Sequence, residues 1–243
     1  MTVRMPAMVP AQEAGWIALF EIASLMPTGW TLVGGQMVHL HCIERGQAPM
    51  RATIDLDAIL DVRARPHVLH DFTEVLAQLG FSSAGVSPWG HQHRWVRGVA
   101  QIDVLIPRHL GGRASARQGV GGGTTVAAPG AQQALDRTER VDVEVDGRVG
   151  VVPRPNLLGA LVAKAATTAI PVDPGRGRHV SDFALLASLL RVADLRGQDL
   201  APGDIRHLRA MMPRVTEEVV HVQGADRGIA MLNAANRRAS SLV

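Results

Sequence analysis

The sequence predicts an α+β protein built as two lobes, because the type of hydrophobic pattern changes once along the chain. Up to about residue 150, short apolar or alternating stretches typical of strands lie between stretches with helical spacing. From Pro155 onward, the patterned stretches have helical spacing. We therefore expect an α/β lobe at residues 1–153, followed by an α-helical C-terminal lobe at residues 154–243.

The composition is that of a folded, water-soluble protein. Of 243 residues, 47% are apolar and 19% are charged, and a chain of this length buries enough surface to form a core without disulfides. Cys42 is the single cysteine, so it forms neither an intrachain bridge nor a zinc-finger motif. The sequence lacks a signal-peptide pattern and an apolar run near the ~20 residues of a membrane helix, so we expect a cytoplasmic protein without a membrane partner.

The basic residues are almost all arginine. The net charge is +3, and Lys164 is the single lysine among 25 basic residues. Guanidinium groups suit bidentate contacts with phosphate, which is compatible with a polyanionic partner. A coding bias toward arginine explains the same composition, so the arginines as a set do not decide between these interpretations.

In the first lobe, strand and helix patterns alternate. The predicted strands cover residues 30–33, 53–60, 81–86, 93–99, 101–106, 141–145 and 148–152, and the predicted helices cover residues 12–26, 36–45 and 66–80. The last two strands should form a hairpin, because Asp146-Gly147 favours a two-residue turn. Residues 1–11 have no periodicity and predict a loose arm, while residues 107–125, rich in Gly and Arg, predict a mobile loop.

Proline and glycine residues divide the second lobe into helices. The predicted helices cover residues 156–169, 180–192, 203–212 and 215–236. Because proline removes a backbone donor and clashes with the preceding turn, we expect a break between helices at Pro213.

Asp55 and Asp57 are the first candidates for a chemical role. On a strand, residues two apart point to the same face with Cα atoms about 6.5 Å apart, so both carboxylates can reach one ion. At about 4 Å they would repel by ~4 kcal/mol at an effective dielectric near 20, which a cation or a proton relieves. Hard oxygen ligands favour Mg²⁺ or Mn²⁺. The alternative is a polar strand face that points to solvent.

Two further features strengthen this interpretation. Gly34-Gly35 follows an apolar strand and precedes a helix, where backbone amides and the helix N-terminus can hold a phosphate. Asp103 lies inside an aliphatic strand, where an unpaired charge is costly to bury, so it needs a partner. If this strand lies beside the strand of Asp55 and Asp57, three carboxylates converge as two-metal phosphoryl transfer requires.

These features together resemble the polymerase-beta-type minimal nucleotidyltransferases, and more closely the AbiEii/MenT branch of bacterial toxins. The motifs that carry the resemblance are Gly34-Gly35 before a helix, Arg51-x-Thr53-x-Asp55-Leu56-Asp57, Ile102-Asp103-Val104-Leu105, and, in the helical lobe, Lys164, Arg176/Arg178 and Asp182-Phe183. The match spans most of residues 30–190. It departs from the family pattern at Gln36, where Ser or Thr is usual, and at His179, where an acid is usual.

The resemblance implies a nucleotidyltransferase-like mixed sheet with flanking helices, and transfer of a nucleoside monophosphate from an NTP substrate. It implies that Asp55, Asp57 and Asp103 hold Mg²⁺ or Mn²⁺ and act in catalysis together with Lys164. The implied nucleotide-binding set is Gly34, Gly35, Gln36, Arg51, Thr53, Lys164, Arg178 and Asp182. The implied acceptor is RNA, in the first place the 3′ end of tRNA, and the implied protein partner is a cognate antitoxin.

Two other functions stay open at this stage. The same chemistry would serve a nucleotidyltransferase that acts on a small molecule such as an aminoglycoside. A non-catalytic basic nucleic-acid-binding protein would instead use its acids only to neutralise arginines. Arg108, Arg113 and Arg117 in the predicted loop would either meet an RNA backbone or stay solvated.

Overall fold

The protein folds as a mixed α+β structure, as the sequence predicts. The computed structural model describes residues 1–218 and 222–240. The strands are β1 (Val3–Arg4), β2 (Trp30–Val33), β3 (Leu56–Leu60), β4 (Ser82–Ser83), β5 (Arg94–Arg97), β6 (Ala100–Pro107), β7 (Val126–Ala128), β8 (Thr138–Val145) and β9 (Arg148–Pro155). The helices are α1 (Pro10–Leu25), α2 (Gly34–Glu44), α3 (Val68–Gln78), α4 (Gly112–Ser115), α5 (Ala131–Asp136), α6 (Leu157–Ala166), α7 (Arg176–Leu189), α8 (Val192–Leu195), α9 (Pro202–Glu218) and α10 (Ala225–Ser240). A short 3₁₀ helix, η1 (Thr167–Ala169), extends α6.

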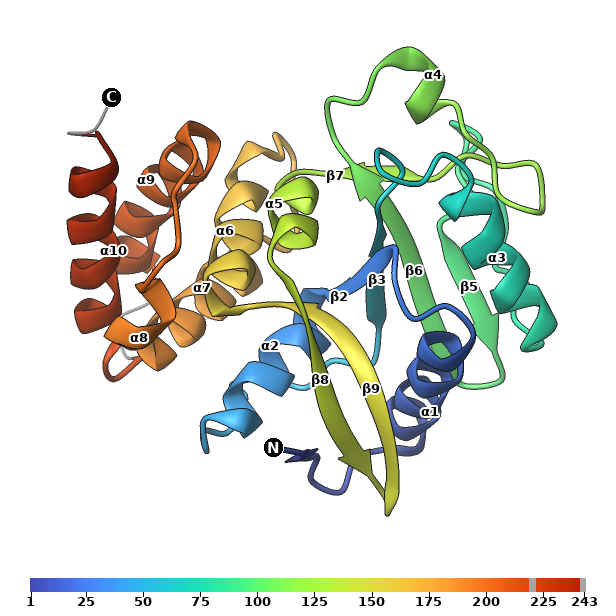
Figure 1. Ribbon diagram of the computed structural model, residues 1–243, viewed down its shortest axis with the longest axis horizontal. Helices are drawn as coiled ribbons and strands as arrows, with labels where there is room; N and C mark the ends of the chain where they lie inside the picture. The colour runs from blue at the N-terminus through green and yellow to red at the C-terminus, as the bar shows by residue number, and fades with distance from the viewer. Residues whose placement is uncertain (219–221, 241–243) are drawn as a thin grey trace.

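The main sheet has β6 as its central strand. The strand order is β2-β3-β6-β5-β4, and β7 also pairs with β6. β2 runs antiparallel to β3, whereas β3 and β6 are parallel neighbours (Figure 1). The sequence of β6 is mostly aliphatic because the strand lies in the core, where Ile102, Val104 and Ile106 are buried. The sheet therefore places the strands with the candidate acids next to each other.

A smaller sheet, β1-β8-β9, contains the predicted hairpin. The turn residues Asp146 and Gly147 have φ of 47° and 73°, the left-handed geometry of a two-residue hairpin turn. β9 packs against α1 and β2, so the hairpin covers part of the main sheet (Figure 1). The predicted loose arm is wrong at Val3, which pairs with Val143 and is buried, because the arm has an apolar side chain to bury there.

Most of the helices after the hairpin gather on one side of the molecule (Figure 1). α6 packs against α5, α7 and α9, and α7 packs against α2 and α10. Since α2 and α5 precede the hairpin in the chain, these contacts join the two predicted lobes, and the boundary at residue 153 stays a prediction. Within residues 1–218 and 222–240, no helix is both long and apolar enough to cross a membrane.

α9 continues through Pro213, so the predicted break there is wrong. Leu208, Met211, Met212 and Val215 on this helix are buried. Their burial offsets the about 3 kcal/mol that an internal proline costs a helix. The predicted helix at residues 215–236 is instead divided between α9 and α10, with Gly224 at φ 87° just before α10.

The predicted strand at residues 53–60 is shorter than expected and begins at Leu56. The carbonyl oxygen of Thr53 accepts hydrogen bonds from the side-chain amides of Gln12 and Gln36, at 2.7 and 2.6 Å. Two side chains thus supply the hydrogen bonds to this carbonyl group that a neighbouring strand would otherwise supply. Asp55 consequently lies before β3 and not on the same strand as Asp57. The predicted strand at residues 81–86 likewise shrinks to β4, and the predicted loop at residues 107–125 contains α4.

Candidate functional site

The strand register brings Asp57 and Asp103 together. Asp57 on β3 is the direct partner of Asp103 on the parallel strand β6. On its other side Asp57 is paired with Val33, the last residue of β2, which places it beside Gly34 at the start of α2. Neighbouring strands lie about 4.8 Å apart and paired residues share a face. Two of the three predicted acids are therefore cross-strand neighbours at the N-terminus of a helix.

Gly34 and Gly35 allow this close approach. Gly34 has φ of +72°, and a Cβ atom there would lie 1.8 Å from Oδ2 of Asp57. A Cβ atom on Gly35 would lie 2.7 Å from Cγ2 of Thr53. The two glycines are thus required by backbone conformation and by space, and they set the carboxylate of Asp57 against the first turn of α2.

We expect Gly34→Ala to lower the free energy of unfolding by about 2 to 4 kcal/mol, because it adds a clash with Asp57 to the strain of a positive φ. Urea unfolding measures this loss. Gly46→Ala is the matched control, since Gly46 has φ of +74° but no atom within 4 Å of its Cβ position. The control should lose only about 1 kcal/mol. Equal losses in both variants would show that the contact with Asp57 contributes nothing.

Asp57 carries unrelieved negative charge. Burial raises its pKa to about 6, with further contributions from the nearby charges of Asp103 and Asp55, while Lys164 and Arg94 act in the opposite direction. A carboxyl group whose ionised form is disfavoured in this way gains from a cation at the same place. The electrostatics therefore indicate a position that suits a positively charged ligand.

This pKa predicts a pH-dependent stability in metal-free buffer. The folded pKa of about 6 lies above the ordinary value of 3.8, so ionised Asp57 destabilises the fold. The penalty is absent below about pH 4 and complete above about pH 6. The free energy of unfolding of Asp57→Asn should therefore exceed that of the wild type by about 3 kcal/mol near neutral pH, and should equal it near pH 4. Urea unfolding across this range, with a chelator present, checks it. A difference that stays constant with pH would contradict it.

Asp103 has a partner that the sequence did not identify. Nε and Nη2 of Arg94 donate to the two carboxylate oxygens of Asp103 at 2.9 and 2.8 Å. The contact follows from the register of β5 against β6, in which the two residues are paired. The sequence showed that Asp103 needs a partner, but the pairing of the weak strand at residues 93–99 was not predicted.

Asp55 lies near the other two acids but is held separately. Its Oδ1 accepts a hydrogen bond of 2.9 Å from Nε2 of Gln101. In the part of the chain that the structure describes, no three His, Cys, Asp or Glu side chains are arranged to hold a metal ion. Asp103 is paired with Arg94 and Asp55 with Gln101, so two of the three predicted carboxylates already have a hydrogen-bond donor as partner. The oxygen donors fit Mg²⁺ in kind, and a metal would have to replace these two contacts.

Lys164 belongs to a buried ionic cluster. Its Nζ lies 2.7 Å from Oδ2 of Asp182, and both residues are about 5% exposed. Arg51 donates to both oxygens of Asp182, at 3.1 and 2.9 Å. Although burial alone would raise the pKa of Asp182, Lys164 and Arg51 hold it below its usual range. The cluster ties α6 and α7 to the segment before β3, and the charge of Lys164 also acts on Asp57.

His39 supports this cluster from α2, a role that the sequence did not predict. Its Nε2 lies 2.7 Å from the carbonyl oxygen of Arg51, which requires the ring to carry its proton on that nitrogen. Burial lowers the pKa of His39, so the neutral form donates this bond. The sequence pattern gave no signal for it, because the contact depends on where the segment before β3 lies.

The remaining predicted nucleotide-binding residues differ in their placement. Gln36 is 1% exposed, its carbonyl accepts from Nε1 of Trp16 at 3.1 Å, and its amide donates to Thr53. Both ends of Gln36 are thus used inside the fold. Thr53 packs its side chain against Gly35. Arg178 is exposed in the first turn of α7 and makes no ion pair with the described residues.

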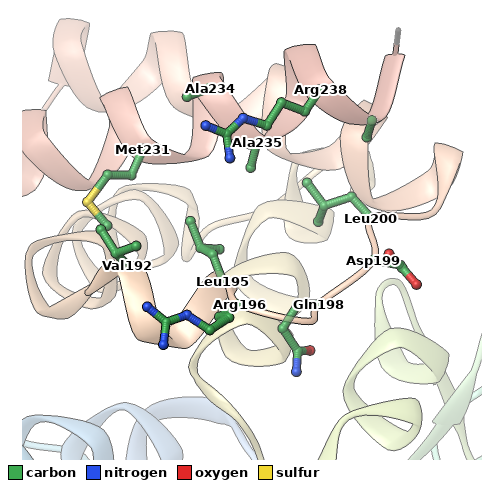
Figure 2. A pocket seen from close by; sticks show the side chains of 11 residues that line it. Val192, Leu195, Arg196, Gln198, Asp199, Leu200, Met231, Ala234, Ala235 and Arg238 are labelled. Atoms are coloured by element: carbon green, nitrogen blue, oxygen red, sulfur yellow. The ribbon is translucent and has the colours of Figure 1, made fainter. Parts of the chain in front are cut away.

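A second feature, an apolar pocket of about 490 Å³, lies between α8 and α10 (Figure 2). Its lining includes Val192, Leu195, Leu200 and Met231. Figure 2 shows these side chains facing one another, with Arg196 and Arg238 nearby. It contains none of the predicted site residues, so it is not the candidate active site.

The comparisons with known proteins concern the fold. No protein-family profile matches the sequence, and no curated protein matches it. An antigenic nucleotidyltransferase-like protein from Paracoccidioides brasiliensis is structurally similar, with a TM-score of 0.53, 15% identity, and coverage of 88% of this chain and 92% of that chain. The antibiotic-resistance factor ANT(2'')-Ia has a TM-score of 0.45, 12% identity, and coverage of 77% and 89%. The first likeness confirms the predicted fold class, a nucleotidyltransferase-like mixed sheet with flanking helices and a helical C-terminal region.

Proposed function

We propose that this chain, which has a nucleotidyltransferase-like fold, transfers a nucleoside monophosphate from an NTP to an RNA acceptor, in the first place the 3′ end of tRNA. One observation carries the proposal: Asp57 lies beside Asp103 in the strand register, against Gly34 at the N-terminus of α2, within the electrostatic reach of Lys164. Carboxylates for a metal, a helix N-terminus for phosphate and a lysine for negative charge are what phosphoryl transfer requires.

Asp57 and Asp103, with Asp55, would hold Mg²⁺ or Mn²⁺. A bound divalent ion supplies positive charge next to the reacting phosphate. The raised pKa of Asp57 supports this placement, because burial and the neighbouring carboxylates disfavour the ionised form more than Lys164 and Arg94 stabilise it. Arg94 now neutralises Asp103, and we infer that its half-exposed guanidinium moves away when the ion binds.

The substrate phosphates would lie at the first turn of α2, beside Gly34, which is partly exposed at the N-terminus of this helix. Lys164 would neutralise the triphosphate together with Arg51, which shares Asp182 with it, and we propose that Arg178 in the first turn of α7 assists. Asp182 faces Lys164 and Arg51, so we assign it a positioning role rather than a contact with the nucleotide.

In the proposed reaction a hydroxyl oxygen of the acceptor attacks the α-phosphorus of the NTP. The new oxygen–phosphorus bond forms as the bond to pyrophosphate breaks, and pyrophosphate leaves in line with the attack. The proton of the attacking hydroxyl passes to solvent, and Asp103 favours its removal, as the sequence resemblance implies. The resemblance to the AbiEii/MenT branch also underlies our proposal that the protein is a toxin with a cognate antitoxin.

The test is transfer of label from each NTP labelled at the α-phosphate, with Mg²⁺ and either total RNA or a panel of aminoglycosides. We expect label in RNA of tRNA size with the wild type and none with Asp57→Asn. Label on a drug would replace the RNA assignment with a small-molecule one. RNA binding without any labelled product would support the non-catalytic alternative. Growth arrest on expression of the wild type but not of Asp57→Asn tests the toxin assignment.

A further inference from the structure

A cleft of about 640 Å³, separate from the carboxylates, gathers basic side chains from distant parts of the chain. It lies where the end of β6, α5, η1 and α9 meet, and Figure 1 labels β6, α5 and α9. Its basic lining residues are Arg63, Arg108, His109, Arg206, His207 and Arg214. Among the described residues that line it there is no Asp or Glu. The cleft is therefore strongly positive.

The arginines of this cleft have no carboxylate partner among the side chains that the structure describes. Arg63 donates to the carbonyl oxygen of His109 at 3.2 Å, and Arg108 donates to the carbonyls of Ala127 and Ala169 at 3.4 and 3.3 Å. The side chains of Arg206 and Arg214 make no hydrogen bond or ion pair with groups that the structure describes. Since like charges gathered without counter-charge repel, an anion in the cleft would be stabilised.

Asp204, whose charge acts on His207 in the cleft, does not neutralise them. Asp204 is fully buried and pairs with Arg137 at 2.6 Å. The pKa of His207 is lowered, first by burial and then by the charge of Arg206, so this ring stays neutral near pH 7. The contribution of Arg206 to the lowered pKa of His207 is a second indication that positive charge is in excess in the cleft.

The arginines on α9 form a row. Arg206, Ala210 and Arg214 follow one another at intervals of four residues, which places them on one face of the helix. Arg206 and Arg214 are about 12 Å apart along the axis, and the small side chain of Ala210 leaves space between them. A row of cations suits a chain of phosphates better than it suits a single anion.

The cleft is also within reach of the candidate active site. Arg108 comes five residues after Asp103, directly after the end of β6. Along an extended strand this separation is about 17 Å. Thr168, which lines the cleft, follows Lys164 by four residues, or about 6 Å along α6 and its 3₁₀ extension. A strand held in the cleft can therefore extend to the carboxylates within a few nucleotides.

We propose that this cleft binds the phosphodiester backbone next to the single-stranded end of the RNA acceptor. The inference rests on the proposed function for the identity of the strand, whereas binding itself requires no catalysis. Of the three arginines in the predicted loop, Arg108 lies in the cleft. Arg113 lies in α4 and Arg117 donates to the carbonyl of Val62, so neither belongs to it.

The experiment measures binding of a fluorescent single-stranded RNA of about 12 nucleotides by anisotropy, between about 50 and 200 mM salt, without NTP or metal. The test variant is R206Q/R214Q. The matched control is R148Q/R237Q, which removes the same charge from exposed positions on β9 and α10 that make no ion pair with the described residues. We expect the test variant to bind about tenfold more weakly, with its salt slope reduced by about 1.4, and the control to stay within about twofold.

Equal weakening of both double variants would overturn the proposal, because it would reflect net charge alone. Competition by inorganic phosphate as effective as competition by unlabelled RNA would also overturn it, in favour of a free-anion site. If R206Q/R214Q is unfolded by circular dichroism, the single variant R214Q replaces it, with an expected slope change of about 0.7. RNA binding that needs these arginines, without nucleotide transfer, would retain the cleft and reject the proposed function.

Discussion

Asp57→Asn is expected to reduce nucleotide transfer by about a thousandfold. The substitution keeps the shape of the side chain, so the contact with Gly34 and the pairing of β3 with β6 remain. What it removes is the negative charge at the point where Asp103, the start of α2 and the field of Lys164 meet. The initial rate of label transfer at saturating NTP and Mg²⁺ measures the effect.

The control for this prediction is Asp142→Asn, which removes one negative charge from an exposed position on β8. It should keep transfer within about twofold of the wild type. Binding of Mn²⁺, followed by electron paramagnetic resonance, gives a readout besides activity and should weaken in Asp57→Asn alone. Transfer within about tenfold of wild type in Asp57→Asn would show that the carboxylate site is wrongly assigned.

The sequence predicts the parts of this molecule in which local pattern and tertiary structure agree. The aliphatic strand around Asp103 and the turn at Asp146-Gly147 are examples. In each, the local pattern favours one backbone conformation, and the fold uses that conformation. The juxtaposition of Asp57 and Asp103 was a conditional prediction, and the parallel pairing of β3 with β6 confirms it. The glycine pair was correctly placed between a strand and a helix, and its positive φ at Gly34 explains why glycine is needed.

Contacts between distant segments decide the rest. Gln12 and Gln36 bind the carbonyl of Thr53 and remove Asp55 from the strand, an effect that spacing within residues 53–57 does not show. Arg94 meets Asp103 because of a strand register that residue types do not specify. Gln36 was assigned to phosphate by its place after the glycines, whereas Trp16, twenty residues earlier, accounts for one end of its side chain.

Lys164→Met is expected to lower kcat/KM for the NTP by about a hundredfold to a thousandfold. The substitution removes a buried cation that would stabilise the negative charge on the phosphates in the transition state. Stability should change less. Asp182 keeps its two hydrogen bonds from Arg51, so the loss should be about 2 kcal/mol rather than the roughly 3 to 5 kcal/mol of a buried acid left alone. Label transfer and urea unfolding measure the two effects.

Two further variants separate charge neutralisation from positioning at this cluster. Arg148→Met removes a cation from the exposed start of β9 and should leave both measurements unchanged. Asp182→Asn keeps both cations but weakens their common acceptor, so a positioning role predicts a raised KM for NTP with a smaller change in kcat. If Lys164→Met lost stability but kept transfer, the lysine would serve only to hold α6 against α7, and the triphosphate would have to be neutralised by Arg51 instead.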